Sequence, residues 1–258
     1  MSEAPSASPA QVTACVLIIG NEILSGRTQD VNLAFIAGAL NEQGIQVREA
    51  RVIPDIAGEI IDTVNRVRER FDYVFTTGGI GPTHDDITAE CIAAAFGTPL
   101  VMHPRIEERI RGYAAERGLS EAVTQASLRM ARVPEGAALI ETEIGAPGFS
   151  IGNVYVMAGI PKVMQSMIRL LAPKLKGALP VRSRSIGAFL GESVVAEPLR
   201  AIQDRYPEVD VGSYPFSEGD RYGTTLVIRG TDEAVLERVL GEVRQMLDGF
   251  SAETVVRD

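Results

Sequence analysis

Residues 76–91 read TTGGIGPTHDDITAEC, and this segment decides the class of fold that we predict. The apolar run Phe71–Phe75 leads directly into Gly78, Gly79 and Gly81, and a helix is expected to follow. A strand that ends in glycines and opens into a helix presents backbone N–H groups to an anion. The segment therefore predicts an α/β fold with a phosphate site at the end of this strand.

The same turn also carries acidic side chains. Asp85 and Asp86 are adjacent and follow His84. Carboxylates beside a glycine loop would repel phosphate unless a divalent cation lies between them. We therefore expect metal-assisted phosphate chemistry, with Mg²⁺ or a similar ion held by Asp86, Asp85 and Glu22. Glu22 follows the carboxyl end of another predicted strand, where ligands bind in open α/β sheets, although it also fits an ordinary surface loop.

Predicted strands and helices alternate along the first two-thirds of the chain. The strand candidates are rich in Val and Ile rather than in alternating polar residues, as is typical of parallel strands covered on both faces. Strands are expected at 14–19, 45–53, 71–75 and 153–157, and helices at 31–43, from 54 onward, and at 86–96, 104–117, 120–130 and 161–171. This alternation predicts a three-layer α/β/α domain with a mostly parallel, doubly wound sheet.

The composition shifts at residues 172–180, which read APKLKGALP. Beyond this segment, strand-like and helix-like stretches follow at 182–189, 193–205, 209–214, 224–228 and 232–248. We therefore expect a disordered leader at 1–11, an α/β domain at 12–172 and a small α+β domain at 180–258.

The overall composition limits the partners and the location of the protein. A formal net charge of −9 disfavours nonspecific binding to nucleic acid or to an anionic membrane surface. No run approaches the roughly 18 apolar residues that a membrane span needs, and the first residues do not resemble a signal peptide. We expect a cytoplasmic protein in which Cys15 and Cys91, both in apolar surroundings, are buried thiols rather than a disulfide or a nucleophile.

Several candidate site residues also fit a purely structural role. A tight turn with positive φ would explain the glycines without a ligand. Asp86 and Asp30 each precede a predicted helix and could act as its N-cap, although a cap accounts for only one of the paired acids at 85 and 86. His84 could be solvated or could hydrogen-bond a phosphate. Hydroxyl groups suited to a phosphate or to metal-bound water are supplied by Ser25, Thr28, Thr83 and Thr88.

The motifs together resemble a known family. The segments GNEILSG (20–26) and TGGIGPTHDDIT (77–88) are similar to those of the molybdopterin-binding MoaB/Mog domain, in the branch found in the competence/damage-inducible protein A (CinA) family. The segments at 146–149 and 157–161 extend the resemblance, and GSYP (212–215) resembles the small domain that follows in CinA proteins. The resemblance covers roughly residues 12–250.

The resemblance implies roles for individual residues. The three glycines of the turn would contact the phosphate of a pterin or nucleotide, and Gly159 would lie at the same ligand. Asp86 would be the essential aspartate, and Asp30 would be the acidic residue of the active cleft. The family pattern commonly has an acidic residue where this chain has Val163, so that either Lys162 meets the anionic end of the ligand or the ligand differs.

The resemblance also implies several functions. The CinA-like branch suggests a metal-dependent ADP-ribose pyrophosphatase, in which the metal polarises a phosphoryl oxygen and the turn's N–H groups stabilise the developing charge. The alternatives are adenylyl transfer to molybdopterin, as in cofactor biosynthesis, and a non-catalytic nucleotide-binding module. Relatives form dimers or trimers, so a homo-oligomer is expected. The amidohydrolase domain of full-length CinA proteins, which deamidates nicotinamide mononucleotide, is not expected in this sequence.

Overall fold

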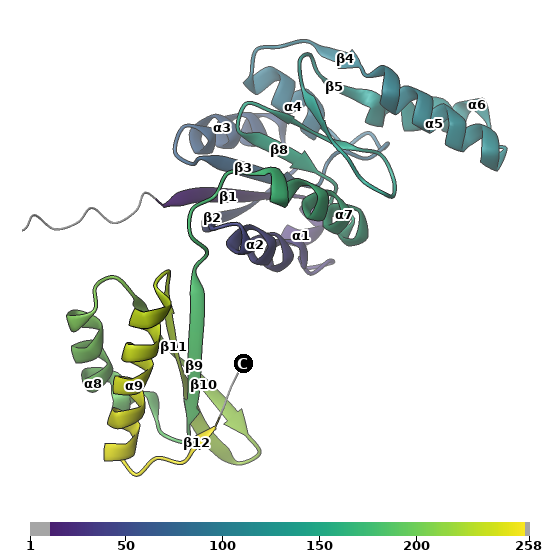
Figure 1. Cartoon of the computed structure of the whole chain (residues 1–258). Coiled ribbons are helices and arrows are strands. Elements are labelled where there is room, and N and C mark those ends of the chain that lie inside the picture. The colour runs from purple at the N-terminus through teal and green to yellow at the C-terminus, as the bar shows by residue number, and fades with distance from the viewer. Residues whose placement is uncertain (1–10, 256–258) are drawn as a thin grey trace, which may run out of the picture. The chain divides into compact units, whose positions relative to one another are not determined.

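The computed structural model describes residues 11–255 (Figure 1). Within that range the chain divides into two compact units, 11–178 and 179–255, and each is described by itself. The leader predicted at 1–11 lies, apart from Gln11, outside the described residues.

The N-terminal unit is built around a six-stranded, mostly parallel sheet with the strand order β2-β1-β3-β8-β7-β6. The first four strands in this order run parallel, and β7 and β6 complete one edge in antiparallel pairing. The strands are β1 (Val12–Ile19), β2 (Ile45–Ile53), β3 (Tyr73–Thr77), β6 (Ala138–Ile140), β7 (Gly148–Ile151) and β8 (Val154–Met157). The predicted α/β class is confirmed, whereas β6 and β7 were not predicted.

Helices cover both faces of this sheet and give the unit three layers (Figure 1). One face packs against α3 (Ala57–Arg68) and α4 (Thr88–Ala95), and the other packs against α2 (Asn32–Glu42) and α7 (Pro161–Leu171). The short helix α1 (Asn21–Leu24) follows β1 directly, and the 3₁₀ turn η2 (Ala172–Lys174) follows α7.

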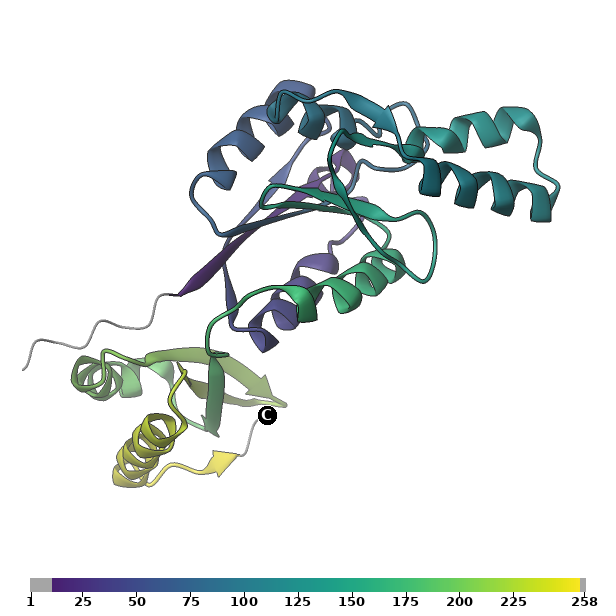
Figure 2. The same ribbon diagram turned by 45° about the horizontal axis from the view of Figure 1, so that its top comes forward.

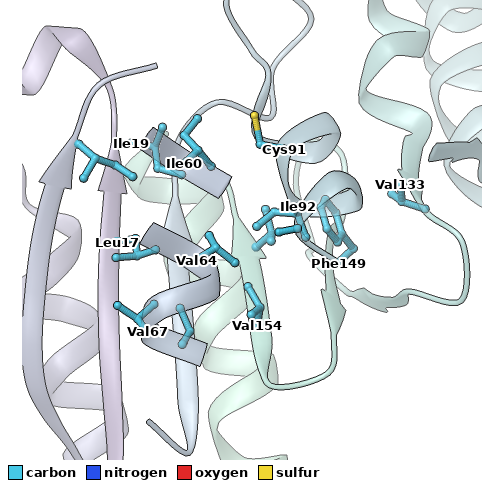
Figure 3. Close-up of a cluster of buried hydrophobic side chains, with 14 of the residues drawn as sticks. Leu17, Ile19, Ile60, Val64, Val67, Cys91, Ile92, Val133, Phe149 and Val154 are labelled. Atoms are coloured by element: carbon cyan, nitrogen blue, oxygen red, sulfur yellow. The ribbon is translucent and has the colours of Figure 1, made fainter. Parts of the chain in front are cut away.

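β1 lies inside the sheet and is buried on both faces. Leu17 belongs to a cluster with Ile60 and Val64 on the α3 side (Figure 3), whereas Val16 belongs to a cluster with Ile36 on the α2 side. Alternation along a strand sends successive side chains to opposite faces, so a continuously apolar strand can fill two cores at once. This explains why the run at 14–19 has no polar alternation.

An insertion, defined here as residues 100–134, interrupts the α/β alternation. It consists of β4 (Leu100–Met102), α5 (Pro104–Arg117), α6 (Glu121–Ser127), the 3₁₀ turn η1 (Leu128–Ala131) and β5 (Arg132–Pro134), and β4 and β5 pair antiparallel. In Figures 1 and 2, α5 and α6 lie beside each other and extend away from the sheet. α5 ends at Gly118, which adopts the left-handed conformation that terminates helices (φ 62°).

The C-terminal unit is a small α+β structure, as predicted. Its four-stranded antiparallel sheet has the order β10-β11-β9-β12, and α8 and α9 share its hydrophobic core. The elements are β9 (Arg182–Ala188), α8 (Glu192–Arg205), β10 (Asp210–Glu218), β11 (Arg221–Gly230), α9 (Glu233–Gly249) and β12 (Thr254–Val255). Asp232 caps α9 by accepting hydrogen bonds from the N–H groups of Ala234 and Val235.

The helices of residues 11–255 include none that is long and apolar enough to cross a membrane. The longest of them, α9, has 17 residues and carries charged side chains along its length.

The two cysteines are free, buried thiols, as expected from the sequence. Burial raises the pKa of Cys15 to about 11, helped by the nearby Glu49 carboxylate, and burial likewise raises the pKa of Cys91 to about 11. Because a raised pKa keeps a thiol protonated, both groups should be neutral and unreactive at pH 8.

We predict that a thiol reagent such as 5,5′-dithiobis(2-nitrobenzoic acid) labels the native protein at least about 100-fold more slowly than the protein unfolded in guanidinium chloride. Time-resolved absorbance at pH 8 measures both rates. Labelling of either cysteine in the native state at the rate of the unfolded chain would contradict the burial of these thiols.

Candidate functional site

The turn after β3 begins with a glycine that no other residue could replace without strain. Gly78 has a φ of 101°, and a Cβ at this position would lie 2.0 Å from the carbonyl oxygen of Ile19, at the end of β1. Its N–H donates to the carbonyl of Met157 at 3.3 Å. Gly78 therefore serves the packing of three strand ends, and its N–H is already committed.

The next glycine is fixed by the start of α4. Gly79 has a φ of 67°, and a Cβ there would lie 2.1 Å from Oγ1 of Thr88, which is fully buried. The Thr88 hydroxyl donates to the carbonyl of Gly78 at 3.0 Å, and its N–H donates to the carbonyl of Gly79 at 2.9 Å. The first residue of α4 thus holds the turn through two hydrogen bonds.

Three successive N–H groups of this turn remain available. No backbone or side-chain hydrogen bond in the described part of the chain uses the N–H of Gly79, Ile80 or Gly81. The carbonyls of Gly78 and Gly79 are held by Thr88, so the segment is fixed while its donors stay free. Successive free N–H groups in a turn form a concave site for an anion.

The paired carboxylates lie just beyond these donors. Asp86 accepts the N–H of Thr83 at 2.8 Å, and the Thr83 hydroxyl lies between both acids, 2.6 Å from Oδ1 of Asp85 and in contact with Oδ2 of Asp86. The hydrogen bond from Thr83 lowers the pKa of Asp85 below its ordinary value. Asp86 does not cap α4, whose N-cap is Ile87, so the structural role considered for it is not observed.

The neighbouring histidine is almost fully solvated. The side chain of His84 is 98% exposed, and its Nδ1 lies 4.0 Å from Oδ1 of Asp85. At this separation the two side chains interact weakly, and the turn does not hold the imidazole in one place.

The predicted set of three metal ligands is not assembled. Within residues 11–255, no group of three or more His, Cys, Asp or Glu side chains is placed to hold a metal ion. Mg²⁺, however, usually takes only one or two carboxylates from the protein and completes its shell with water and substrate phosphate. Asp85 and Asp86, with the Thr83 hydroxyl, therefore fit an ion that binds together with a phosphate. Glu22 is not close to this pair and lines a different hollow, described below.

A hollow of about 350 Å³, including its open mouth, is lined by the three residues that carry the free N–H groups. We call it the first hollow; its wall includes the turn at Gly79–Gly81, Asp86 and Glu90 of α4, and Arg129 and Arg132 of the insertion. The sequence analysis missed both arginines, because about 50 residues separate them from the turn and no motif marks them.

A second hollow, of about 370 Å³, lies against α1, α2 and α7. It is lined by Glu22, Asp30, Asn32, Gly78 and Gly159, among others. Asp30 is not the N-cap of α2, which is Val31, but its Oδ2 accepts the N–H of Leu33 at 2.9 Å in the first turn of that helix. The candidate acids are thus divided between two hollows rather than gathered in one cleft.

Asn32 is a further residue that the sequence analysis missed. Its side chain is buried, Nδ2 donates to the carbonyl of Gly159 at 2.8 Å, and Oδ1 has no partner. A Cβ on Gly159 would lie 3.2 Å from Cα of Gly78, so this glycine also permits a close approach of backbones.

Of the remaining candidates, Thr28 lines the second hollow, whereas Ser25 and residues 162–163 lie outside both hollows. Ser25 is exposed and donates to the carbonyl of Glu22 at 3.2 Å. Val163, where the chain departs from the family pattern, packs against the core on the α2 side, and Lys162 is exposed. Val163 therefore has a packing role, which explains an apolar residue at this position.

Comparison with known families agrees with this architecture. Residues 15–177 match the family model described as "Probable molybdopterin binding domain". The chain belongs to this molybdopterin-binding domain family. A second model, described as "FAD synthase, middle domain", matches residues 180–256.

Individual relatives resemble most of the chain. A "CinA-like protein" of Thermomicrobium roseum is 33% identical over 245 residues, covering 91% of this chain and 59% of that protein. A "Probable FAD synthase" of Caenorhabditis elegans is 30% identical over 267 residues, covering 93% of this chain and 51% of that protein. The chain therefore spans little more than half the length of these two relatives.

A solved structure supports the fold of the N-terminal unit. The crystal structure described as protein CinA of unknown function from Thermoplasma acidophilum superposes with a TM-score of 0.57 at 33% identity, covering 64% of this chain and 99% of that one. The predicted resemblance to MoaB/Mog domains and to the CinA-like branch is thereby confirmed.

We predict that Gly78→Ala lowers the free energy of unfolding by about 2–4 kcal/mol, because left-handed backbone and overpacking against Ile19 each oppose a Cβ. Gly38 provides the matched control. It lies in α2, is exposed, and has open space where a Cβ would lie, so Gly38→Ala should raise stability by about 0.5–1 kcal/mol. Urea denaturation measures both; equal effects of the two substitutions would contradict the close approach at Gly78.

Proposed function

We propose that the N-terminal unit binds a phosphorylated nucleotide or pterin at the carboxyl ends of β1, β3 and β8. The observation that carries this proposal is the set of three free N–H groups at Gly79, Ile80 and Gly81, which line the first hollow. In open α/β sheets, ligands bind outside the carboxyl ends of the strands, where such turns lie. Fixed donors without internal acceptors suit a phosphate group, which is rich in acceptors.

The carboxylate pair suggests that this ligand is cleaved at a pyrophosphate bond. A divalent ion bound with the phosphate would polarise a phosphoryl oxygen and supply an activated water. Thr83 keeps Asp85 and Asp86 side by side, and the lowered pKa of Asp85 keeps its carboxylate charged. The fixed N–H groups would stabilise negative charge that develops on the phosphate. Asp30, in the second hollow, would hold another part of the ligand rather than the reacting phosphate.

The relatives favour a nucleotide as the ligand. The nematode relative is named a probable FAD synthase, and the C-terminal unit matches the FAD synthase middle domain. These names, together with the CinA-like relatives, lead us to propose dinucleotides with a pyrophosphate bond, such as ADP-ribose or FAD, as substrates. Molybdopterin, named in the family description, is the alternative ligand.

A second candidate function is a nucleotide-binding module without turnover. It is favoured by Val163, which packs against the core where the family pattern commonly has an acidic residue. This candidate predicts that nucleotides bind and are recovered unchanged.

We predict that Asp86→Asn lowers Mg²⁺-dependent hydrolysis of ADP-ribose or FAD by at least about 100-fold, since the charge is lost while an oxygen remains to accept the Thr83 N–H. Product formation followed by chromatography, with and without divalent metal, measures the effect. Equal rates in the two proteins would refute the catalytic role of Asp86, and tight binding without any product would favour the non-catalytic module.

Asp72 offers a matched control for this substitution. It accepts the N–H and the hydroxyl of Thr13 at 2.8 and 2.9 Å, the same arrangement as Asp86 with Thr83, but at the opposite end of β1. These hydrogen bonds lower the pKa of Asp72, so its contribution to stability is present at neutral pH and is lost as the pH falls through that lowered value. Asp72→Asn should therefore reduce stability at pH 7 and leave the rate unchanged.

A further inference from the structure

Two arginines line the first hollow together with the glycine turn. Arg129 lies in η1 and Arg132 begins β5, so both belong to the insertion rather than to the central sheet. We propose that their guanidinium groups form a second anion-binding wall, opposite the N–H groups of Gly79–Gly81, and that the ligand is a diphosphate held between the two walls. The inference rests on the proposed function and names the part of the ligand that this hollow recognises.

Most guanidinium N–H groups of the two arginines have no acceptor within the described chain. The side chain of Arg129 makes no hydrogen bond within the described chain; its nearest carboxylate oxygen, on Glu90, is 3.9 Å away. Arg132 donates to the same oxygen of Glu90 at 3.3 Å, which is a long bond. One carboxylate oxygen of Glu90 therefore lies near two guanidinium groups. Each guanidinium carries five N–H donors, so this single oxygen cannot accept hydrogen bonds from most of them.

Part of the Arg129 side chain is also buried without a partner. Its Nε is inaccessible to solvent and has no acceptor. Buried polar groups in native proteins are nearly always hydrogen-bonded, so an anion that draws the Arg129 side chain toward the hollow would supply an acceptor that the protein alone does not. Phosphate oxygens match the planar fork of a guanidinium and accept two hydrogen bonds from it.

Arg68 shows what an arginine with a structural role looks like in the same unit. Its Nε also lacks a partner, but its guanidinium packs over the ring of Phe96 at 4.2 Å and donates to the carbonyl of Ala95 at 3.1 Å. Arg129 has neither an aromatic partner nor a carbonyl acceptor among the described residues. Its free donors therefore distinguish it from an arginine that is used for packing.

The two hollows differ in the charge of their lining residues. In the first hollow the two arginines offset the carboxylates of Asp86 and Glu90. The lining of the second hollow contains Glu22 and Asp30 and neither arginine nor lysine, so it repels an anion. The charged end of a ligand is therefore directed to the first hollow, where backbone donors and guanidinium donors approach it from two sides. Two walls of donors suit two linked phosphate groups better than one.

The test uses inorganic pyrophosphate and ADP-ribose as probes, with and without Mg²⁺, in titration calorimetry on the full chain. Arg129→Gln and Arg132→Gln should each weaken binding of both probes by at least about tenfold, and the double variant by at least about 100-fold. Arg129→Lys, which keeps the charge but loses the planar fork, should give an intermediate loss.

Arg105 provides the matched control. It lies in the same insertion, pairs with Glu141 at 3.0 Å and does not line the first hollow, so Arg105→Gln should bind both probes within about twofold of the wild type. Circular dichroism establishes that each variant is folded, and Arg129→Lys keeps the test decisive if a Gln variant is not.

The outcomes separate this inference from the proposed function. If the wild type binds the probes and the arginine variants bind them equally well, the guanidinium wall is refuted while the N–H site stands. If the wild type binds neither probe under any condition, both proposals fail together. Equal losses in Arg105→Gln and Arg129→Gln would also overturn the inference, since they would indicate only a general effect of charge.

Discussion

The close contact between Gly78 and the carbonyl of Ile19 is the constraint on which the candidate site depends. It brings the ends of β1 and β3 together without an intervening side chain, and the N–H of Gly78 joins them to β8 through Met157. Thr88 then fixes the turn from α4 by bonding two successive carbonyls. With its carbonyls held from inside, the turn leaves the next three N–H groups without internal acceptors.

This arrangement gives the glycines a double role. Packing within the protein is sufficient to explain why Gly78 and Gly79 are glycines, since both have positive φ and a Cβ on either would meet Ile19 or Thr88. The proposed anion site follows from that packing, so a packing role and a ligand-binding role for these glycines are compatible.

The acidic candidates are divided between the two hollows. Asp86 shares the first hollow with two arginines, whereas Glu22 and Asp30 line the second hollow, which contains no arginine.

Much of the fold could be predicted because it depends on local sequence. The run at 14–19 has the apolar pattern of a doubly covered strand, and Pro104 with Gly118 marks both ends of α5 correctly. The strands β6 and β7 escaped prediction because they have only three and four residues, too few to show a period. The helix predicted from residue 86 begins at Thr88, because Asp86 turns back to accept the N–H of Thr83.

The site could be predicted only in part, for a physical reason. Asp30 and Asp86 look alike in sequence, each preceding a helix. Only the structure shows that Asp30 accepts an N–H from the first turn of its helix, whereas Asp86 closes the turn before its helix. Arg129, Arg132 and Asn32 reach the hollows through long-range packing, which no local motif records. Likewise, the spacing of Glu22, Asp85 and Asp86 along the chain did not reveal that the sheet keeps Glu22 apart from the pair.

The most direct measurement of the central claim is a titration of ¹⁵N-labelled protein with pyrophosphate and Mg²⁺, followed by amide chemical shifts. If an anion binds the turn, the amide resonances of Gly79, Ile80 and Gly81 should move together and saturably, while that of Gly78, whose N–H is bonded to Met157, should move much less. Saturable shifts confined to other amides, such as those of Glu22 and Asn32 around the second hollow, would contradict the account.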